Sequence, residues 1–272
     1  MVIRLLDRSR SLLDLPELGF REDDMALLQN ALKTPEGMIL VTGPTGSGKT
    51  TTLYGMLKAL RAKEINIMTL EDPVEYRLPL IRQTEINLAR EVGFSQGVRS
   101  ILRQDPDVVF IGEIRDEETA QMAVRSALTG HQVFGTLHTN SALGALTRLK
   151  DLGVPKGMLS GNVIALMSQR LVRKLCEKCK VPHPQEIGFL PQGCDECFQS
   201  GYKGREAIAE ILPFDVHAND LLASKATIKD FREHFLAQGA IFLKEHAWQK
   251  VCQGINSITE AERVVGSLRG ES

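Results

Sequence analysis

The sequence predicts an α/β fold in which a mostly parallel sheet is covered by helices on both faces. Strand-like apolar runs alternate with helical stretches from about residue 38 to residue 149, a pattern typical of parallel strands joined by helical crossovers. Residues 43–50 read GPTGSGKT and lie between an apolar run and a helical stretch. This strand, glycine-rich loop and helix are the context that a phosphate-binding loop requires.

Length and composition indicate a globular protein. The 272 residues are enough for one large or two modest domains, and 43% of them are hydrophobic. The net charge of −1 argues against a nucleic-acid or anionic-membrane partner. No apolar run approaches the ~20 residues that span a bilayer, and the N-terminus is too short and too charged for a signal peptide. We therefore expect a cytoplasmic protein without a transmembrane segment.

The predicted elements follow one another in a regular order. Helices are predicted at 21–32, 49–60, 95–104, 117–128 and 142–149, and strands at 38–41, 66–70, 108–112 and 132–136. Residues 80–86 alternate with period two, which predicts an antiparallel edge strand or a hairpin. Residues 158–175 read as a helix. From about residue 214 we expect three or four short helices, with a buried, inert thiol at Cys252.

The glycine-rich loop is predicted to bind phosphate. Its backbone N–H groups and the following helix N-terminus favour an anion. Lys49 is expected to reach the β- and γ-phosphates, and the Thr50 hydroxyl to hold Mg²⁺. The alternative is a glycine-rich turn with an incidental lysine. The predicted contacts are Gly43, Pro44, Thr45, Gly46, Ser47, Gly48, Lys49, Thr50 and Thr51.

Carboxylates follow two of the predicted strands, at the edge where an open α/β sheet places its active site. Glu71, Asp72 and Glu75 follow the strand at 66–70, and Glu113 follows the strand at 108–112. Glu113 is predicted to polarise the attacking water, and Asp72 or Glu75 to orient the metal shell. The alternative is that strand-end carboxylates only cap the next helix, which fits Asp116.

Two histidines bracket the strand at 132–136. His138 follows the strand, where a γ-phosphate sensor would lie, whereas His131 precedes it. A lone histidine is more often structural, but His138 falls at the functional edge of the sheet. A phosphate contact is therefore favoured for His138 and left open for His131. Arg99 and Arg103 share one helix face and are candidates for a phosphate contact, within the chain or across a subunit boundary. A solvated basic face is the alternative.

Two C-x-x-C pairs predict a metal site. Fourteen residues separate Cys176 and Cys179 from Cys194 and Cys197. Two such pairs can present four sulfurs tetrahedrally to Zn²⁺, and four cysteines leave no open position, so the site is predicted to be structural. The metal would replace a core that this short segment, rich in Pro and Gly, does not supply. A redox role is the alternative.

Four motifs in one order resemble those of the type II/IV secretion ATPases. The loop at 43–50 resembles the Walker A motif, and residues 71–75 resemble the Asp box. Residues 102–116 resemble the Walker B region, with Glu113 as its glutamate, and residues 130–140 resemble the His box. The tetracysteine motif is similar to that of the assembly branch, which includes the GspE and PilB proteins of type II secretion and type IV pilus assembly.

The resemblance implies an organisation and a function. It implies a RecA-like P-loop NTPase core at 21–172, a tetracysteine subdomain at 173–205 and a mostly helical subdomain at 206–272. Residues 1–20, with Arg4 and Arg8, look like the remnant of a preceding domain and linker. Members of the family usually have N-terminal domains that close over the nucleotide. The chain is then either a piece excised from a longer protein or a naturally short member, and ring assembly and ATPase rate should be reduced without such a domain.

The implied activity is an ATPase motor that assembles pilins or pseudopilins as a hexameric ring. The implied cofactors are ATP, Mg²⁺ and structural Zn²⁺. The implied partners are an inner-membrane platform protein and a membrane-recruiting subunit, at the cytoplasmic side of the inner membrane of a bacterial cell. The alternatives are a nucleic-acid-dependent motor on the same fold, and a nucleotide-switched binding module with little turnover.

Overall fold

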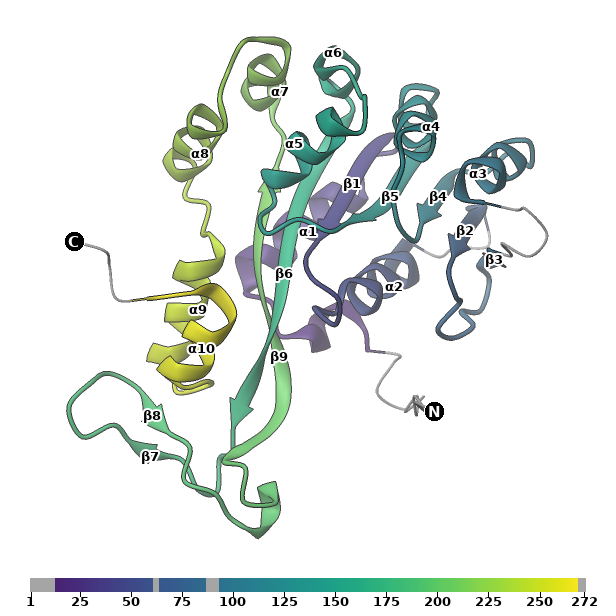
Figure 1. Cartoon of the computed structure of the whole chain (residues 1–272). Coiled ribbons are helices and arrows are strands. Elements are labelled where there is room, and N and C mark those ends of the chain that lie inside the picture. Colours follow the sequence, from purple (N-terminus) through teal and green to yellow (C-terminus); the bar gives the residue numbers. More distant parts are fainter. Residues whose placement is uncertain (1–12, 61–63, 87–92, 269–272) are drawn as a thin grey trace.

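A seven-stranded sheet forms the centre of the structure (Figure 1). The structure is a computed structural model that describes residues 13–60, 64–86 and 93–268. The strand order is β3-β2-β4-β5-β1-β6-β9. The strands are β1 (Gly37–Thr42), β2 (Ile67–Glu71), β3 (Arg82–Glu85), β4 (Val108–Ile111), β5 (Gln132–Leu137), β6 (Val163–Leu175) and β9 (Tyr202–Pro213). All neighbouring pairs are parallel except β6 and β9. The predicted parallel sheet is therefore confirmed.

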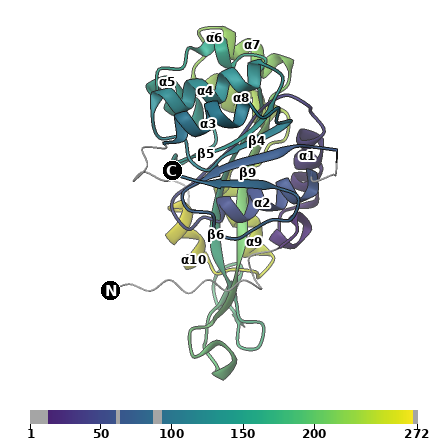
Figure 2. The same ribbon diagram turned by 90° about the vertical axis from the view of Figure 1, so that its right-hand side faces the viewer.

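Helices cover both faces of this sheet (Figure 2). One face packs against α1 (Glu22–Leu32) and α2 (Lys49–Leu60). The other packs against α3 (Phe94–Leu102), α4 (Glu117–Leu128), α5 (Gly144–Asp151), α6 (Lys156–Leu159), α7 (Val216–Ala223) and α8 (Ile228–Ala237). Alternate residues of a strand point to opposite faces, so Met38 and Leu40 of β1 enter one core while Ile39 and Val41 enter the other. This is why the strand reads as a continuous apolar run.

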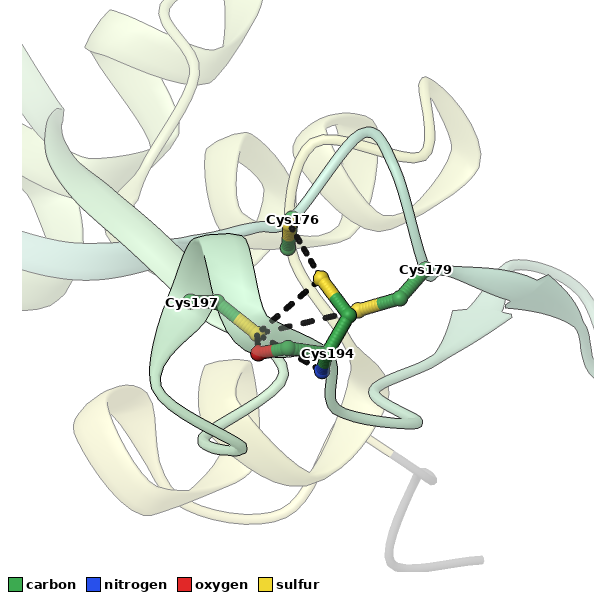
Figure 3. Close-up of side chains that lie close together, drawn as sticks. All are labelled: Cys176, Cys179, Cys194 and Cys197. Atoms are coloured by element: carbon green, nitrogen blue, oxygen red, sulfur yellow. Dashed lines mark hydrogen bonds between the residues drawn. The ribbon is translucent and has the colours of Figure 1, made fainter.

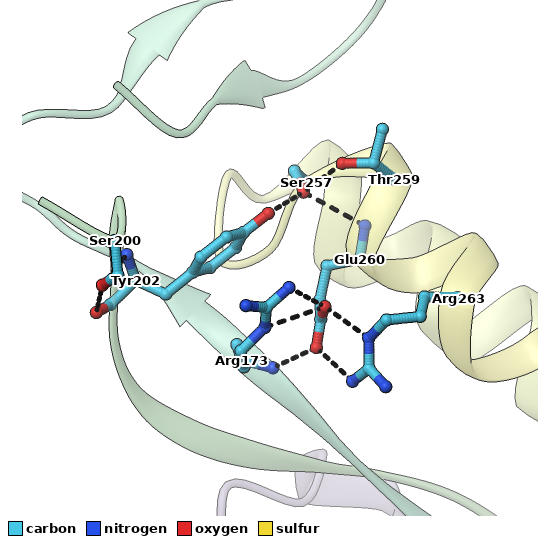
Figure 4. A network of polar contacts seen from close by, with 7 residues as sticks. All are labelled: Arg173, Ser200, Tyr202, Ser257, Thr259, Glu260 and Arg263. Atoms are coloured by element: carbon cyan, nitrogen blue, oxygen red, sulfur yellow. Dashed lines mark hydrogen bonds and ion pairs between the residues drawn. The ribbon is translucent and has the colours of Figure 1, made fainter. Parts of the chain in front are cut away.

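Two further helices, α9 (Leu243–Cys252) and α10 (Ile258–Val265), pack against β6 and β9. A polar network fastens α10 to β6 (Figure 4). Buried Glu260 accepts hydrogen bonds from Arg173 Nε at 2.9 Å and from Arg263 Nε at 2.8 Å. The Arg173 guanidinium lies over the Tyr202 ring at 4.1 Å, and the Tyr202 hydroxyl is 2.7 Å from Ser257 Oγ. The carboxylate thus joins the last helix to the end of the sheet.

The prediction of a helix at 158–175 was wrong. A short α6 is followed by β6, which pairs with β1 on one side and β9 on the other. Because the first part of β6 is buried on both faces, its residues VIALM form a continuous apolar run, and such a run does not distinguish a strand from a buried helix. Three or four short helices were predicted after about residue 214, and the structure has four there, α7 to α10.

Two smaller predictions were also wrong. Residues 82–85 form an edge strand as expected, but β3 runs parallel to β2 instead of antiparallel, because the chain makes a long excursion through residues 72–81 before pairing. Cys252 is exposed, not buried, because it lies on the outer side of α9.

The proposed domain boundaries stay predictions. The boundary at 172 lies inside β6, and that at 205 inside β9, so the cysteine segment is an insertion between two strands of the main sheet. It contains the short strands β7 (Val181–Pro182) and β8 (Phe189–Leu190) and extends beyond the ends of β6 and β9 (Figure 1). Arg4 and Arg8 lie outside the described residues. Of the helices described, none has the length and apolar character needed to cross a bilayer.

Candidate active site and metal centre

The glycine-rich loop lies between the end of β1 and the start of α2 and borders a cavity of about 440 Å³. Three of its glycines have positive φ angles: 146° at Gly43, 79° at Gly46 and 88° at Gly48. At Gly43 a side chain is also excluded by space, because a Cβ atom would lie 2.5 Å from the Gln169 carbonyl of β6. Only glycine allows the loop to turn this close to the sheet.

Lys49 spans the loop. Its Nζ donates to the carbonyl oxygens of Gly43 at 2.8 Å and Pro44 at 3.1 Å. Burial is the main reason why the pKa of Lys49 is lowered, and the charge of Glu113 opposes this. The Ser47 hydroxyl is buried without a hydrogen-bond partner among the described residues. A cationic side chain, a helix N-terminus and an unpaired hydroxyl are the groups that a nucleotide phosphate and its Mg²⁺ require.

Gln169 of β6 connects the phosphate loop to the sheet and to α2 by hydrogen bonds. Its Nε2 donates to the Ser47 carbonyl at 2.9 Å, and its Oε1 accepts from the Thr52 hydroxyl of α2 at 2.7 Å. The sequence did not predict this contact, since 117 residues separate Gln169 from Thr52. Leu171 and Arg205, from β6 and β9, also line the cavity and were not predicted.

Glu113 lies across the cavity as the centre of a charged cluster. Its Oε2 accepts from Arg115 Nη2 at 2.5 Å, and its Oε1 lies 3.2 Å from His138 Nε2. The Arg115 hydrogen bond is the largest cause of the lowered pKa of Glu113 and outweighs the effect of burial. The carboxylate is therefore ionised near neutral pH. Arg115 also lies 4.0 Å from Asp72; the sequence reasoning missed this arginine, although it lies only two residues after Glu113.

The two histidines lie in different environments. His138 lines the cavity beside Glu113. Burial, followed by the charge of Lys49, lowers the pKa of His138, so its ring is neutral at pH 7. His131 precedes β5, at the end of the strand that is far from the cavity, and does not line the cavity. Its Nδ1 lies 2.9 Å from the carbonyl oxygen of Ser126 in α4.

The three carboxylates after β2 all line the cavity, but they differ in exposure. Asp72 and Glu75 are exposed, whereas Glu71 is buried. The Glu71 carboxylate accepts from Thr69 Oγ1 at 2.5 Å, from Gln83 Nε2 at 3.1 Å and from the Tyr54 hydroxyl. Whether these carboxylates contact nucleotide or metal stays a prediction.

Asp116 and the two arginines of α3 lie outside this group. Asp116 accepts from the Thr119 N–H at 2.8 Å and caps α4, as the alternative interpretation expected. Arg99 forms an ion pair with Glu118 at 2.5 Å, and Arg103 caps the C-terminal end of α3. Neither arginine lines the cavity, so their contact with a nucleotide across a subunit boundary stays a prediction.

The four cysteines of the insertion converge on one point (Figure 3). Their sulfur atoms all lie within 4.8 Å of one another. Three separations are 3.8 Å (Cys176–Cys194), 3.8 Å (Cys179–Cys197) and 3.7 Å (Cys194–Cys197). A tetrahedron with Zn–S bonds of about 2.3 Å has edges of about 3.8 Å, so the four sulfurs fit Zn²⁺.

Backbone N–H groups support these sulfurs. The N–H groups of Cys194 and Gly201 both donate to Cys197 Sγ at 3.2 Å. Such bonds favour the thiolate that binds a metal. Although burial opposes ionisation, they lower the pKa of the Cys197 thiol. The cluster is therefore suited to a structural metal ion.

The parallel sheet, the phosphate loop and the strand-end glutamate are the features of a P-loop NTPase fold with a RecA-like core. The chain belongs to the type II/IV secretion system protein family, whose model matches residues 1–263. It is 44% identical over 279 residues to the type II secretion system protein E of Pseudomonas aeruginosa and 43% identical over 279 residues to the type II secretion system ATPase E of Vibrio cholerae. Both alignments cover 97% of the chain and 55% of the relative, so the chain spans about half the length of these relatives.

Solved structures agree with this assignment. The pilus retraction motor PilT with bound ADP has a TM-score of 0.71 and 28% identity, over 93% of this chain and 67% of that chain. The ATPase DotB of Legionella pneumophila has a TM-score of 0.72 and 24% identity, over 93% of this chain and 65% of that chain. The second likeness concerns the fold alone.

Proposed function

We propose that the chain hydrolyses ATP as the motor of a type II secretion or type IV pilus assembly machine. The observation that carries the hydrolytic part is the position of Glu113, an ionised carboxylate that lines the same cavity as the phosphate loop and Lys49. A nucleotide-binding module without turnover has no need of such a group at this point.

Several residues of the cavity have a proposed part in the reaction. The loop N–H groups and Lys49 bind the phosphates, and the Thr50 hydroxyl holds Mg²⁺, which neutralises phosphate charge when it is bound. Glu113 orients the attacking water and accepts its proton. Arg115 and His138 each contact one oxygen of Glu113, which fixes the direction in which the carboxylate points.

The machine is proposed from the relatives. Two of them are named for type II secretion, and a structural neighbour is titled a pilus motor. We propose that the chain works as a hexameric ring at the cytoplasmic side of the inner membrane. There it would pass the energy of hydrolysis, through a platform protein, to the addition of pilin-like subunits. A membrane-recruiting subunit would hold the ring in place.

Replacing Glu113 with glutamine tests the hydrolytic step. The amide keeps the size of the side chain but cannot accept the proton, so kcat should fall by about 10²–10⁴-fold, the usual contribution of a general base. The dissociation constant for ATP, measured with a fluorescent analogue, should change little. The control is Glu117→Gln, an exposed glutamate of α4 that does not line the cavity.

Two results would contradict the proposal. If Glu113→Gln hydrolyses ATP at the wild-type rate, Glu113 is not the general base of the reaction. A wild-type chain that binds ATP but shows no turnover above background, alone or with the machine's other proteins, would favour the nucleotide-switched binding module.

A further inference from the structure

A buried carboxylate lies at the end of β2, beside the phosphate-loop cavity. Glu71 is 3% exposed and accepts hydrogen bonds from three side chains: Tyr54, Thr69 and Gln83. All three donors are neutral, and no lysine or arginine in the described part of the chain is paired with Glu71. Both of its oxygens are therefore occupied within the protein.

Tyr54 connects this carboxylate to the helix that follows the phosphate loop. It lies on α2, one turn after Lys49 and Thr50, and is 1% exposed. Its ring packs edge-to-face on Tyr76, with ring centres 4.6 Å apart, and on Phe110 of β4, at 6.4 Å. Since aromatic contacts on two sides fix the ring, its hydroxyl is held at the Glu71 carboxylate.

Gln83 connects the same carboxylate to the loop at residues 72–81. Its Nε2 donates to Glu71 at 3.1 Å and to the Tyr76 carbonyl at 3.1 Å, and its Oε1 accepts from the Leu78 N–H at 2.7 Å. The Gln83 carbonyl in turn accepts from Arg77 Nη1 at 2.9 Å. The side chain of one edge-strand residue thus holds the loop at two backbone positions.

The loop that is held in this way carries the exposed carboxylates of the cavity. Asp72 and Glu75 both line it, and Asp72 lies 4.0 Å from the Arg115 guanidinium that binds Glu113. A shift of the loop would therefore move two carboxylates and disturb the arginine that fixes Glu113.

We infer that Tyr54, Glu71 and Gln83 form a positioning network that holds the acidic loop 72–81 against the phosphate-loop helix. The inference deepens the proposed function and rests on it. Tyr54 and Gln83 are positioning residues, and Glu71 acts through hydrogen bonds within the protein instead of as a ligand of nucleotide or metal. The network keeps Asp72 and Glu75 in a fixed position on the wall of the phosphate-loop cavity.

Two substitutions test the network. Tyr54→Phe keeps the packed ring and removes the hydroxyl, and Gln83→Met keeps the length of the side chain and removes the amide. In each variant kcat should fall by about tenfold or more, because small misplacements of reacting groups cost up to about 10²-fold. The dissociation constant for ATP should stay within about twofold, because the phosphate loop itself is intact.

Tyr76→Phe is the matched control. It is the same substitution in the adjacent ring, and the Tyr76 hydroxyl has no hydrogen-bond partner among the described residues. Hydrogen exchange supplies a readout that is independent of turnover. In Tyr54→Phe the Leu78 amide should exchange faster while the amides of β1 keep their protection, and in Tyr76→Phe both should behave as in the wild type.

The outcomes separate the alternatives. Wild-type kcat in Tyr54→Phe, or an equal loss in Tyr76→Phe, would overturn the positioning network. Faster exchange throughout the sheet would assign Tyr54 a role in overall stability only, and would also overturn it. If the wild-type chain hydrolyses no ATP, the proposed function fails, whereas the exchange of Leu78 in the two tyrosine variants still decides whether the network holds the loop.

Discussion

Glu71 and Glu113 lie at the carboxyl ends of neighbouring parallel strands, β2 and β4, yet their surroundings give their carboxyl groups different acidities. Arg115 lies at hydrogen-bond distance from Glu113 and is the main cause of its lowered pKa. Glu71 has only neutral donors, and burial raises its pKa above the ordinary value. Both residues are glutamates at the same edge of the sheet. The difference between a group that can act on water and a group that holds a loop comes from the side chains around each carboxylate.

Glu260 is a third carboxylate, and its pKa leads to a prediction about stability. Burial by itself would raise this pKa, but hydrogen bonds from Arg263 and Arg173 outweigh burial and lower the pKa to about 2. A carboxyl whose pKa is lower in the folded state stabilises the fold at pH values above its unfolded pKa of about 4.3, and this contribution is lost as the pH falls toward 2.

Glu260→Gln should therefore lower the free energy of unfolding by about 1–2 kcal/mol at pH 7, since both arginines are partly exposed and screened by water. The difference from the wild type should stay constant above about pH 5 and narrow between about pH 4.3 and pH 2. Urea unfolding at a series of pH values measures it. Glu233→Gln, an exposed residue of α8, is the control. If the difference in the free energy of unfolding between Glu260→Gln and the wild type does not depend on pH, the charge of the Glu260 carboxylate does not cause the stabilisation.

At the scale of elements, the cysteine insertion illustrates how a short segment is held without a core of its own. The described hydrophobic cluster around it consists of the cysteines alone: Cys176, Cys179, Cys194 and Cys197. Folding of this segment should then depend on the metal, because metal binding supplies the free energy that buried side chains supply elsewhere.

Cys176→Ser should reduce the zinc content, measured by atomic emission, from about one ion per chain to nearly none, because one of four tetrahedral ligands is lost. Limited proteolysis should then cut between residues 176 and 201 faster, while the seven-stranded sheet stays protected. Cys252→Ser is the matched control, since Cys252 is exposed and outside the cluster. Full zinc content in Cys176→Ser, or none in the wild type, would contradict the metal centre.

The wrong prediction for β6 also belongs to this scale. Its sequence, VIALMSQRLVRKL, is apolar in its first half, and neither a period of 3.6 nor a period of 2 dominates there. These residues form a strand because they pair with β1 and β9. In the sequence, β1 lies more than a hundred residues before β6, and β9 lies tens of residues after it. Local patterns do not contain such long-range pairing.

At the scale of the whole molecule, the charge distinguishes the two motor hypotheses. A net charge of −1 and 5% aromatic residues argue against a nucleic-acid motor, which uses basic surfaces and aromatic stacking residues. Single-stranded DNA should therefore leave the ATPase rate unchanged at about 50 mM salt, where phosphate contacts are strongest. The cytoplasmic domain of a platform protein should raise the rate. Steady-state ATPase assays with each addition measure this, and stimulation by DNA alone would reverse the choice.

The sequence by itself determined the local features of this protein. The phosphate loop, the two cysteine pairs, the strand-end carboxylates and most helices follow from residue types at fixed spacing, because each depends on the geometry of a few consecutive residues. Only the tertiary structure determined the side-chain contacts between segments that are distant in the sequence. It placed Gln169 beneath the phosphate loop, Arg115 and His138 on Glu113, and Tyr54 and Gln83 on Glu71. These contacts depend on the order of the strands in the sheet and on which strands pair. No short stretch of sequence specifies the strand order or the pairing.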